Sequence, residues 1–459
     1  MRAFAAALFA IGLTIGGVGG APASAAPRDW RTTGLHPIGQ PIEVGGVAVG
    51  YLVRDRHLYA RAMRPESGEV LWEREITPSR QTAGILILPA KAGDNVVLLE
   101  PRPQSGKNWA SLAIIEPVTG RVLQNSRPAI FRTTPYGCFD DEAACAMSVP
   151  FKGGVRKEYR LDSMTGAFTP NPADLASART VGEGGLMELG IRPEEPLALV
   201  RDGEIQWRRP IGDAFPTGYS TDNGWNWMHA EEEGVFAGSV YGPGTWTADA
   251  VSIDLSKGAS AGLDERTGAV LWRDNGSEVG CDYSLSLRGE PVRCRSRGTV
   301  RYEHKVQRES FKDVDVTLEG FDPRTGRTRW SIPAGPATAL ISFLTSTPVA
   351  GARSILADLP AGKRKIDLAD GSLTVPAPGE VFWCLTRSRF DFHEGYTSDE
   401  FPERFDRVGD NLATACTADG KPARSGKPSA EATKAVGATA NGYSVVATID
   451  GYRGIAVGG

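Results

Sequence analysis

The sequence predicts an all-β fold in which four-stranded units repeat around a ring, a β-propeller. A first observation is the composition: 55 Gly and 31 Pro in 459 residues favour many turns over long helices. A second is the spacing of recurrent turn glycines, about 50 residues, close to the period of propeller blades. The third is a recurring phrase in which Trp follows the turn Gly by four positions: Gly68 to Trp72, Gly203 to Trp207, Gly268 to Trp272 and Gly326 to Trp330.

Eight turn glycines define the expected units in chain order: Gly68, Gly120, Gly166, Gly203, Gly268, Gly326, Gly371 and Gly420. A strand-like run precedes the better-kept turns, as at 57–63, and a short run ending at Trp follows, as at 70–72. Each unit is therefore expected to contain a hairpin with a Gly-tipped turn. Eight blades is the preferred count. Seven is the alternative, because the Gly420 unit is degraded; residues 443–449 and 453–457 would then help to close the ring with the segment after Ile38.

The Gly and Trp of the phrase have a structural explanation. Gly accepts the positive φ of a tight turn, and Asp or Thr beside it can hydrogen-bond to the turn backbone. A Trp that recurs with the repeat can cover the seam between adjacent sheets while its N–H stays bonded. We therefore interpret four residues as packing residues rather than ligand contacts: Trp72, Trp207, Trp272 and Trp330.

Residues 262–272 read Gly-Leu-Asp-Glu-Arg-Thr-Gly-Ala-Val-Leu-Trp, and residues 320–330 read Gly-Phe-Asp-Pro-Arg-Thr-Gly-Arg-Thr-Arg-Trp. Both resemble the repeat of the pyrroloquinoline-quinone-type (PQQ-like) β-propellers. The resemblance covers essentially the whole mature chain. Its departures are Gln124, Pro170 and Val375 in place of Trp, and Glu116 in place of Asp. It implies antiparallel four-stranded blades, commonly eight.

The resemblance also raises the question of whether the protein binds a quinone cofactor. Dehydrogenases of this kind bind the quinone through Arg or Lys and a Ca²⁺ held by carboxylate and amide side chains, and the alcohol enzymes add a disulfide between adjacent cysteines. This sequence has no adjacent Cys pair and no Cys-x-x-Cys-His haem motif. Asp313 with Asp315, and residues 140–142, are interpreted as solvated turns. We therefore expect no PQQ, no Ca²⁺ and no other metal.

The N-terminus has the form of an export signal. An apolar run follows Arg2 and ends at Ala23-Ser24-Ala25, a small-x-small cleavage pattern. We expect a signal peptide at 1–25, a lead at 26–37 and one propeller domain at 38–459. The mature protein is then secreted or extracytoplasmic, in the cell wall or the periplasm, with no transmembrane segment.

Six cysteines in an exported chain predict disulfides. Proximity in sequence favours Cys138 with Cys145, Cys281 with Cys294, and Cys384 with Cys416. The formal net charge of −4 offers no basic surface, so a nucleic-acid partner is not expected. The protein is expected to be a monomer.

Long irregular stretches at 208–230, 242–258, 299–316 and 390–407 are expected on the face opposite the Gly turns, around the mouth of the channel. Exposed aromatic side chains in long loops are plausible recognition groups. The candidates for binding are Trp225, Trp227, Trp246, Phe390, Phe392 and Tyr396. The alternative interpretation is that these rings pack the insertions themselves.

These features lead to two hypotheses about function and a third option. The first hypothesis is a non-catalytic secreted scaffold that presents one loop-rich face to an extracytoplasmic protein or cell-wall glycan, similar in role to periplasmic propellers that act as assembly scaffolds. The alternative is an enzyme acting on a polysaccharide or small substrate at the channel mouth. Its acid/base candidates are His229 and His393 with Asp391 or Glu394. A quinone-dependent dehydrogenase is the third option.

Overall fold

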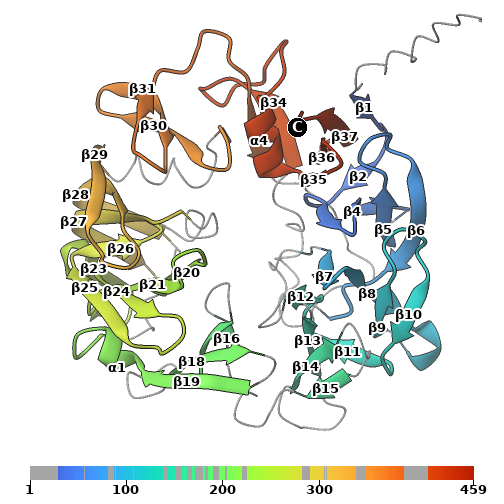
Figure 1. Cartoon of the computed structure of the whole chain (residues 1–459), viewed down its shortest axis with the longest axis horizontal. Helices are drawn as coiled ribbons and strands as arrows, with labels where there is room; N and C mark the ends of the chain where they lie inside the picture. The colour runs from blue at the N-terminus through green and yellow to red at the C-terminus, as the bar shows by residue number, and fades with distance from the viewer. Residues whose placement is uncertain are drawn as a thin grey trace, which may run out of the picture.

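Mainly antiparallel sheets follow one another round a ring in this computed structural model, and the last strand lies beside the first described strand (Figure 1). The structure describes residues 29–458 except 56, 81–86, 88, 107, 138–142, 150–156, 163–167, 171–178, 181–184, 190–195, 202–203, 220–224, 282–289, 304, 306–307, 337–347 and 387–411. The predicted signal peptide therefore lies outside the described residues. The all-β propeller fold is confirmed.

The first half of the ring contains three sheets. The first consists of β2 (His36–Pro37), β3 (Ile42–Val44), β4 (Val47–Arg54), β5 (His57–Met63) and β6 (Val70–Ile76). A nine-stranded sheet follows with β7 (Ala90–Ala92), β8 (Asn95–Pro101), β9 (Trp109–Ile115), β10 (Val122–Asn125), β11 (Ala129–Phe131), β12 (Tyr136–Gly137), β13 (Ala143–Val149), β14 (Lys157–Asp162) and β15 (Phe168–Pro170). The third has β16 (Arg179–Thr180), β17 (Leu186–Glu188), β18 (Pro196–Arg201) and β19 (Glu204–Pro210). Because β11 pairs with both β9 and β13, the nine-stranded sheet joins two successive repeats.

The second half continues the pattern. One sheet holds β20 (Trp225–Ala230), β21 (Val235–Val240), β24 (Ala259–Asp264) and β25 (Val270–Asn275). The next holds β22 (Thr245–Trp246), β23 (Ala250–Asp254), β26 (Ser277–Val279), β27 (Val292–Glu303), β28 (Arg308–Phe321) and β29 (Thr328–Pro336). Then come β30 (Ser354–Leu359), β31 (Gly362–Asp367), β32 (Leu373–Thr374), β33 (Phe382–Thr386), β34 (Leu412–Cys416), β35 (Ala438–Ala440), β36 (Tyr443–Thr448) and β37 (Gly451–Ala456). Short helices α1 (Ile211–Ala214) and α4 (Ala430–Val436), and 3₁₀ turns at Pro103–Ser105 and Leu255–Lys257, connect strands.

Burial along the strands follows their depth in the ring. The first six residues of β4 are all buried, because neighbouring sheets cover both faces of an inner strand. The outer strand β19 alternates between exposed and half-buried positions along its whole length. The inner strand β4 contains the β-branched and aromatic residues that suit a pleated surface, Val47, Val49, Tyr51 and Val53.

The recurring Trp joins each sheet to the next one. The Trp72 indole lies over Gly120, where an added Cβ would stand 2.5 Å from the ring, and its Nε1 donates to Pro117 O at 2.7 Å. The same contact recurs between Trp207 and Gly268, Trp272 and Gly326, and Trp330 and Gly371. Gly203 lies outside the described residues, so its predicted turn is not tested. At these seams each of the four repeat tryptophans packs against the next sheet, as predicted.

The ring is closed by a strand nearer the N-terminus than expected. Strand β1 (Trp30–Arg31) pairs with β37, and the Trp30 indole lies over Gly68 of the first sheet. Residues 443–449 and 453–457 do form the closing hairpin, as predicted. The segment after Ile38 adds a side chain: Gln40 exchanges two hydrogen bonds with the Ala447 backbone, at 2.8 and 2.9 Å.

Gly420 does not lie between the two outer strands of a sheet. It follows β34 in a short turn that returns to an isolated bridge between Cys416 and Pro422. The disulfide between Cys384 and Cys416 links β33 to β34. The disulfide between Cys281 and Cys294 links the segment after β26 to β27. Both predicted pairs are confirmed. Cys138 lies outside the described residues, so the pair with Cys145 stays a prediction, as does the blade count.

Candidate functional site on the turn face

Alternate connections of an antiparallel sheet fall on opposite sides, which gives the ring two distinct faces. We call the side that carries the Gly turns between the last two strands of a sheet the turn face. The hairpin between the first two strands, such as 231–234 between β20 and β21, lies on the same side. The opposite side, which carries the connection from β21 to β24, is the loop face.

His229 lies at the turn face, so its predicted place at the loop-face mouth is wrong. It is the second-last residue of β20, beside the 231–234 hairpin, and its side chain is 8% exposed. Its ring stacks on Phe236 with centroids 4.7 Å apart. Its Nε2 stands 3.2 Å from Glu265 Oε2, but the other Glu265 oxygen accepts from Arg201 at 2.5 Å. The carboxylate is thus shared with a structural ion pair between neighbouring sheets.

Trp227 is a core residue, which contradicts its assignment to a binding surface. It is 3% exposed, packs edge-on against Phe215 and covers Gly238 on the adjacent strand. Successive side chains of β20 are buried on both faces of the strand, as at Asn226, Trp227 and Met228, and loop-like composition around 221–229 hid this strand. Trp225 begins the same strand, and its side chain lies outside the description.

Trp246 is the predicted binding residue that remains exposed, at 56%. Of the nine tryptophans whose side chains are described, it alone belongs to the exposed class. It lies on β22 within the connection from β21 to β24, on the loop face. The other predicted candidates, Phe390, Phe392, Tyr396, His393, Asp391 and Glu394, fall within 387–411, outside the described residues.

A sheet that we call the projecting sheet extends the loop face around Trp246. It consists of β22, β23, residues 299–303 of β27 and residues 308–314 of β28. The strands β27 and β28 have 12 and 14 residues, against eight in β4. Its surface carries ion pairs between exposed groups, such as Lys305 with Asp249 at 2.6 Å. Two neighbouring repeats therefore build one surface feature.

A pocket of about 370 Å³ lies at the turn face, where three successive sheets meet. Its wall comes from the 229–233 end of β20 and its hairpin, from Glu290, Pro291, Gly320 and Phe321 beside β27 and β28, from Arg329 and Trp330 on β29, and from Arg353, Leu368 and Ala369 beside β30 and β31. Its size lies at the lower end of the range typical of ligand pockets, about 300 to 1,000 Å³. The sequence did not predict this pocket.

Trp330, which lines this pocket, lacks the hydrogen bond that the other repeat tryptophans make. The indoles of Trp30, Trp72, Trp207 and Trp272 each donate to a main-chain carbonyl in the next turn, at 2.6 to 2.7 Å. The Nε1 of Trp330 is buried and has no hydrogen-bond acceptor among the described residues. Leu368, which occupies the turn position of Pro323, and Trp330 both line the pocket. The pocket thus opens where this seam lacks its hydrogen bond.

The pocket carries more negative than positive charge. Four glutamates line it, Glu231, Glu232, Glu233 and Glu290, against two arginines, Arg329 and Arg353. Both arginines already have partners: Arg353 pairs with Glu290 at 2.7 Å, and Arg329 pairs with Asp322 at 3.1 Å. The three consecutive glutamates of the hairpin have no ion-pair partner within the described parts of the chain.

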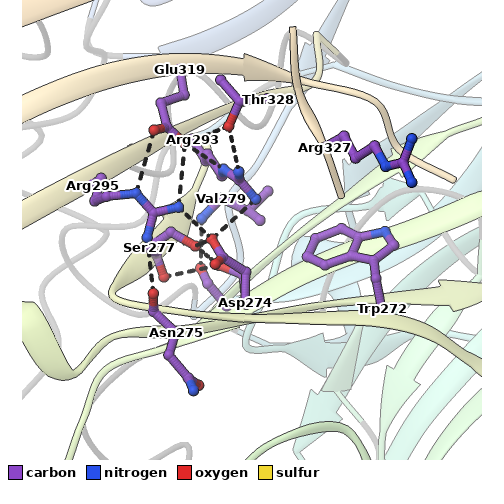
Figure 2. A network of polar contacts seen from close by, with 12 residues as sticks. Trp272, Asp274, Asn275, Ser277, Val279, Arg293, Arg295, Glu319, Arg327 and Thr328 are labelled. Carbon is purple, nitrogen blue, oxygen red and sulfur yellow. Dashed lines mark hydrogen bonds and ion pairs between the residues drawn. The ribbon is translucent and has the colours of Figure 1, made fainter. Parts of the chain in front are cut away.

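In a second charged cluster each charged side chain has an ion-pair partner within the cluster, although Arg293 Nη1, 3.1 Å from Asp274 Oδ2, makes no hydrogen bond among the described residues. Arg293 and Arg295 on β27 face Glu319 on β28 and Asp274 on β25, and dashed lines in Figure 2 trace their contacts. Burial would raise the pKa of Glu319, but hydrogen bonds from Arg295 and Arg293 outweigh it and hold that pKa below its usual value. Since Asp274 belongs to the preceding sheet, the cluster joins two sheets.

Two general features complete the description. Over the described ranges, no group of three or more His, Cys, Asp or Glu side chains gathers as metal ligands do. No helix among the residues that the structure describes has the length and apolar character needed to cross a membrane.

These features define a β-propeller in which a Trp of one sheet lies over a turn Gly of the next. The chain is similar to BamB from Moraxella catarrhalis, with 13% identity over 76% of this chain and 82% of that chain and a TM-score of 0.27. It is also similar to a europium-containing methanol dehydrogenase, with 10% identity, 78% and 84% coverage and a TM-score of 0.33.

A third similar structure is the quinohemoprotein alcohol dehydrogenase ADHIIG from Pseudomonas putida HK5, with 11% identity, 78% and 71% coverage and a TM-score of 0.38. No protein-family description matches the chain, and no curated protein matches it. Likenesses this distant carry no argument about activity. Function is therefore argued from the residues of this chain.

Proposed function

We propose that the protein is an exported, non-catalytic β-propeller scaffold that holds an extracytoplasmic protein or a cell-wall glycan on its loop face. The observation that carries the proposal is the projecting sheet with Trp246 on its outermost strand. Two neighbouring repeats contribute to it: β22 and β23 lie in the connection between β21 and β24, and they pair with the extended end of β27. A large aromatic side chain held on a rigid sheet is a typical anchor of a binding surface.

Two further observations support this proposal. The two described disulfides favour an oxidising compartment, in agreement with the expected export signal. The described acid/base candidate, His229, shares its carboxylate partner with Arg201 and stacks on Phe236, which suits a packing role. The proposal includes no quinone, Ca²⁺ or other cofactor. The alternative enzyme centred on His393 stays a prediction.

The proposal is tested by capture from the producing cell's envelope and medium, with the full mature chain as bait. Trp246→Ala should lose at least about tenfold of the recovered partner, because removal of an interface anchor costs 2 kcal/mol or more. The matched control is Val375→Ala, which shortens a side chain that is 69% exposed on the outer segment after β32. It should recover the partner as wild type does.

Two results would contradict the proposal. Recovery of no partner by the wild-type protein would remove the binding role. Equal recovery of the partner by Trp246→Ala and the wild-type protein would show that the partner does not bind at the projecting sheet. Both variants change exposed side chains, so their folding should be unaffected.

A further inference from the structure

The turn-face pocket is separate from the projecting sheet and lies on the other face of the ring. Its wall is contributed by residues from His229 to Ala369, which belong to three sheets. Phe321 and His229 are buried members of its lining, with exposures of 0% for Phe321 and 8% for the His229 side chain. The three glutamates of the 231–234 hairpin stand at one side, and Trp330 stands at another.

The Trp330 N–H indicates what one end of a ligand must supply. Four equivalent indoles donate to main-chain carbonyl oxygens, so a carbonyl oxygen is the acceptor that this kind of N–H takes at the other seams. The Nε1 edge of the ring lies over Gly320, which also lines the pocket. A buried donor without an acceptor costs free energy, and a ligand carbonyl would remove that cost.

The glutamates indicate the charge of the other end. Glu231, Glu232 and Glu233 have no ion pair in the described part of the molecule, whereas the two pocket arginines are each neutralised by a carboxylate. The lining of the pocket therefore has a net negative charge, with four glutamates against two arginines. A cationic group gains from that charge, and an anionic group is repelled.

We propose that the turn-face pocket binds a basic peptide segment of a partner protein, with a peptide carbonyl accepting from Trp330 Nε1 and a Lys or Arg side chain facing Glu231–Glu233. A peptide supplies both groups on one short chain, and its carbonyl reproduces the acceptor used at the other four seams. The segment lies at the junction of three sheets, so its binding also links them. This site is independent of the loop-face function proposed above.

The test uses the full mature chain and two fluorescein-labelled peptides, one with the central sequence Gly-Lys-Lys-Gly and one with norleucine in place of each Lys. Binding is followed by fluorescence anisotropy. The Lys peptide should bind at least about tenfold more tightly than the norleucine peptide, and its affinity should fall as salt is raised from 0.05 to about 0.5 M.

Matched variants separate the pocket from general acidity. Glu231→Gln with Glu232→Gln should weaken Lys-peptide binding about tenfold. The control, Glu66→Gln with Glu204→Gln, removes the same charge from two exposed glutamates of other sheets and should leave affinity within about twofold. Trp330→Phe should weaken it about fivefold through the lost donor. Its thermal midpoint should stay closer to wild type than that of Trp272→Phe, which loses the bond to Pro323.

The proposal is overturned if the Lys peptide does not bind, if the norleucine peptide binds equally well, or if the two double variants have the same effect. Loss of binding in Trp330→Phe with full retention in the glutamate double variant would also overturn it, because the ligand would then be neutral. Capture of a partner through Trp246 does not depend on any of these outcomes, so failure here and failure of the loop-face proposal are distinguishable.

Discussion

Five tryptophans each lie over a glycine of the neighbouring sheet, and this pair is the unit that joins the ring. Two separate requirements, a positive φ and the close approach of the indole, select glycine at these positions. Gly326 has φ +68°, a region that favours Gly, and an added Cβ would stand 2.6 Å from the Trp272 ring. The sequence predicted the Trp as packing but could not show that its partner is the turn Gly of the following repeat, about 50 residues on.

The two requirements can be separated by comparing two glycines with similar φ. Gly326→Ala should lower the free energy of unfolding by about 2 to 4 kcal/mol, because it adds a clash with Trp272 to the cost of positive φ. Gly420→Ala, with φ +73° and no atom within 4 Å of its added Cβ, should cost only about 1 to 2 kcal/mol. Urea unfolding of both variants measures the difference. Equal costs would mean that the indole contact does not constrain the Gly.

Turn carboxylates make stability depend on pH at the acid end. The hydroxyl of Thr267 donates to Asp264 Oδ1 at 2.6 Å, and this bond, opposed by burial and aided by the Thr267 N–H, holds the pKa of Asp264 below its usual value. A lowered folded pKa contributes stability that is present above the unfolded pKa of about 3.9 and is lost as pH falls through the folded pKa.

Asp264→Asn should therefore unfold at lower urea than wild type at pH 7, and the gap should shrink through pH 4 and disappear by about pH 2. The comparison isolates Asp264 because all other carboxylates titrate in both proteins. A gap of constant size from pH 7 to pH 2 would contradict the assigned cause.

At the scale of elements, β1 closes the ring. Trp30 pairs with Gly454, and its Nε1 donates to Pro65 O at 2.6 Å, so the N-terminal strand supplies the missing outer strand and Trp of the last sheet. Sequence analysis found both strands of the closing hairpin but placed residues 26–37 in a lead. The clue was Trp30, a Trp with no turn Gly four positions before it, because β1 and its neighbour β37 are not joined by a turn.

Trp30→Ala should lower the free energy of unfolding by about 3 kcal/mol, as expected for loss of a large packed aromatic side chain. Trp246→Ala is the control and should change it by less than about 0.5 kcal/mol, because its ring is exposed. Chemical denaturation with fluorescence detection compares them. A Trp30 variant as stable as the control would show that β1 does not close the ring.

At the scale of the whole molecule, repetition explains why the fold could be predicted from the sequence more fully than the function. Local signals, such as Gly268 followed by Trp272, predicted strands, turns and ring because each repeat makes the same local contacts. The turn-face pocket was not predictable, since its wall joins residues from three sheets that lie far apart in the sequence. His229 was assigned to the wrong face because a single strand boundary decides the side on which it lies.

The same argument separates the two predicted tryptophans that the structure describes most clearly. Trp227 lies on a regular strand and is buried, whereas Trp246 lies in an inserted connection and is exposed. Composition is alike around both residues. Only the pairing of β20 with β21, and of β22 with β23, distinguishes a core residue from a surface anchor.

Photo-crosslinking in the producing cell tests the central claim most directly, with a photoreactive amino acid placed at position 246 or, separately, at position 375. The account predicts one dominant adduct from position 246, on the projecting sheet, and no adduct above background from position 375. An adduct from position 375 with none from position 246 would place the partner elsewhere, and absence of any adduct from position 246 would contradict a scaffold that works through its loop face.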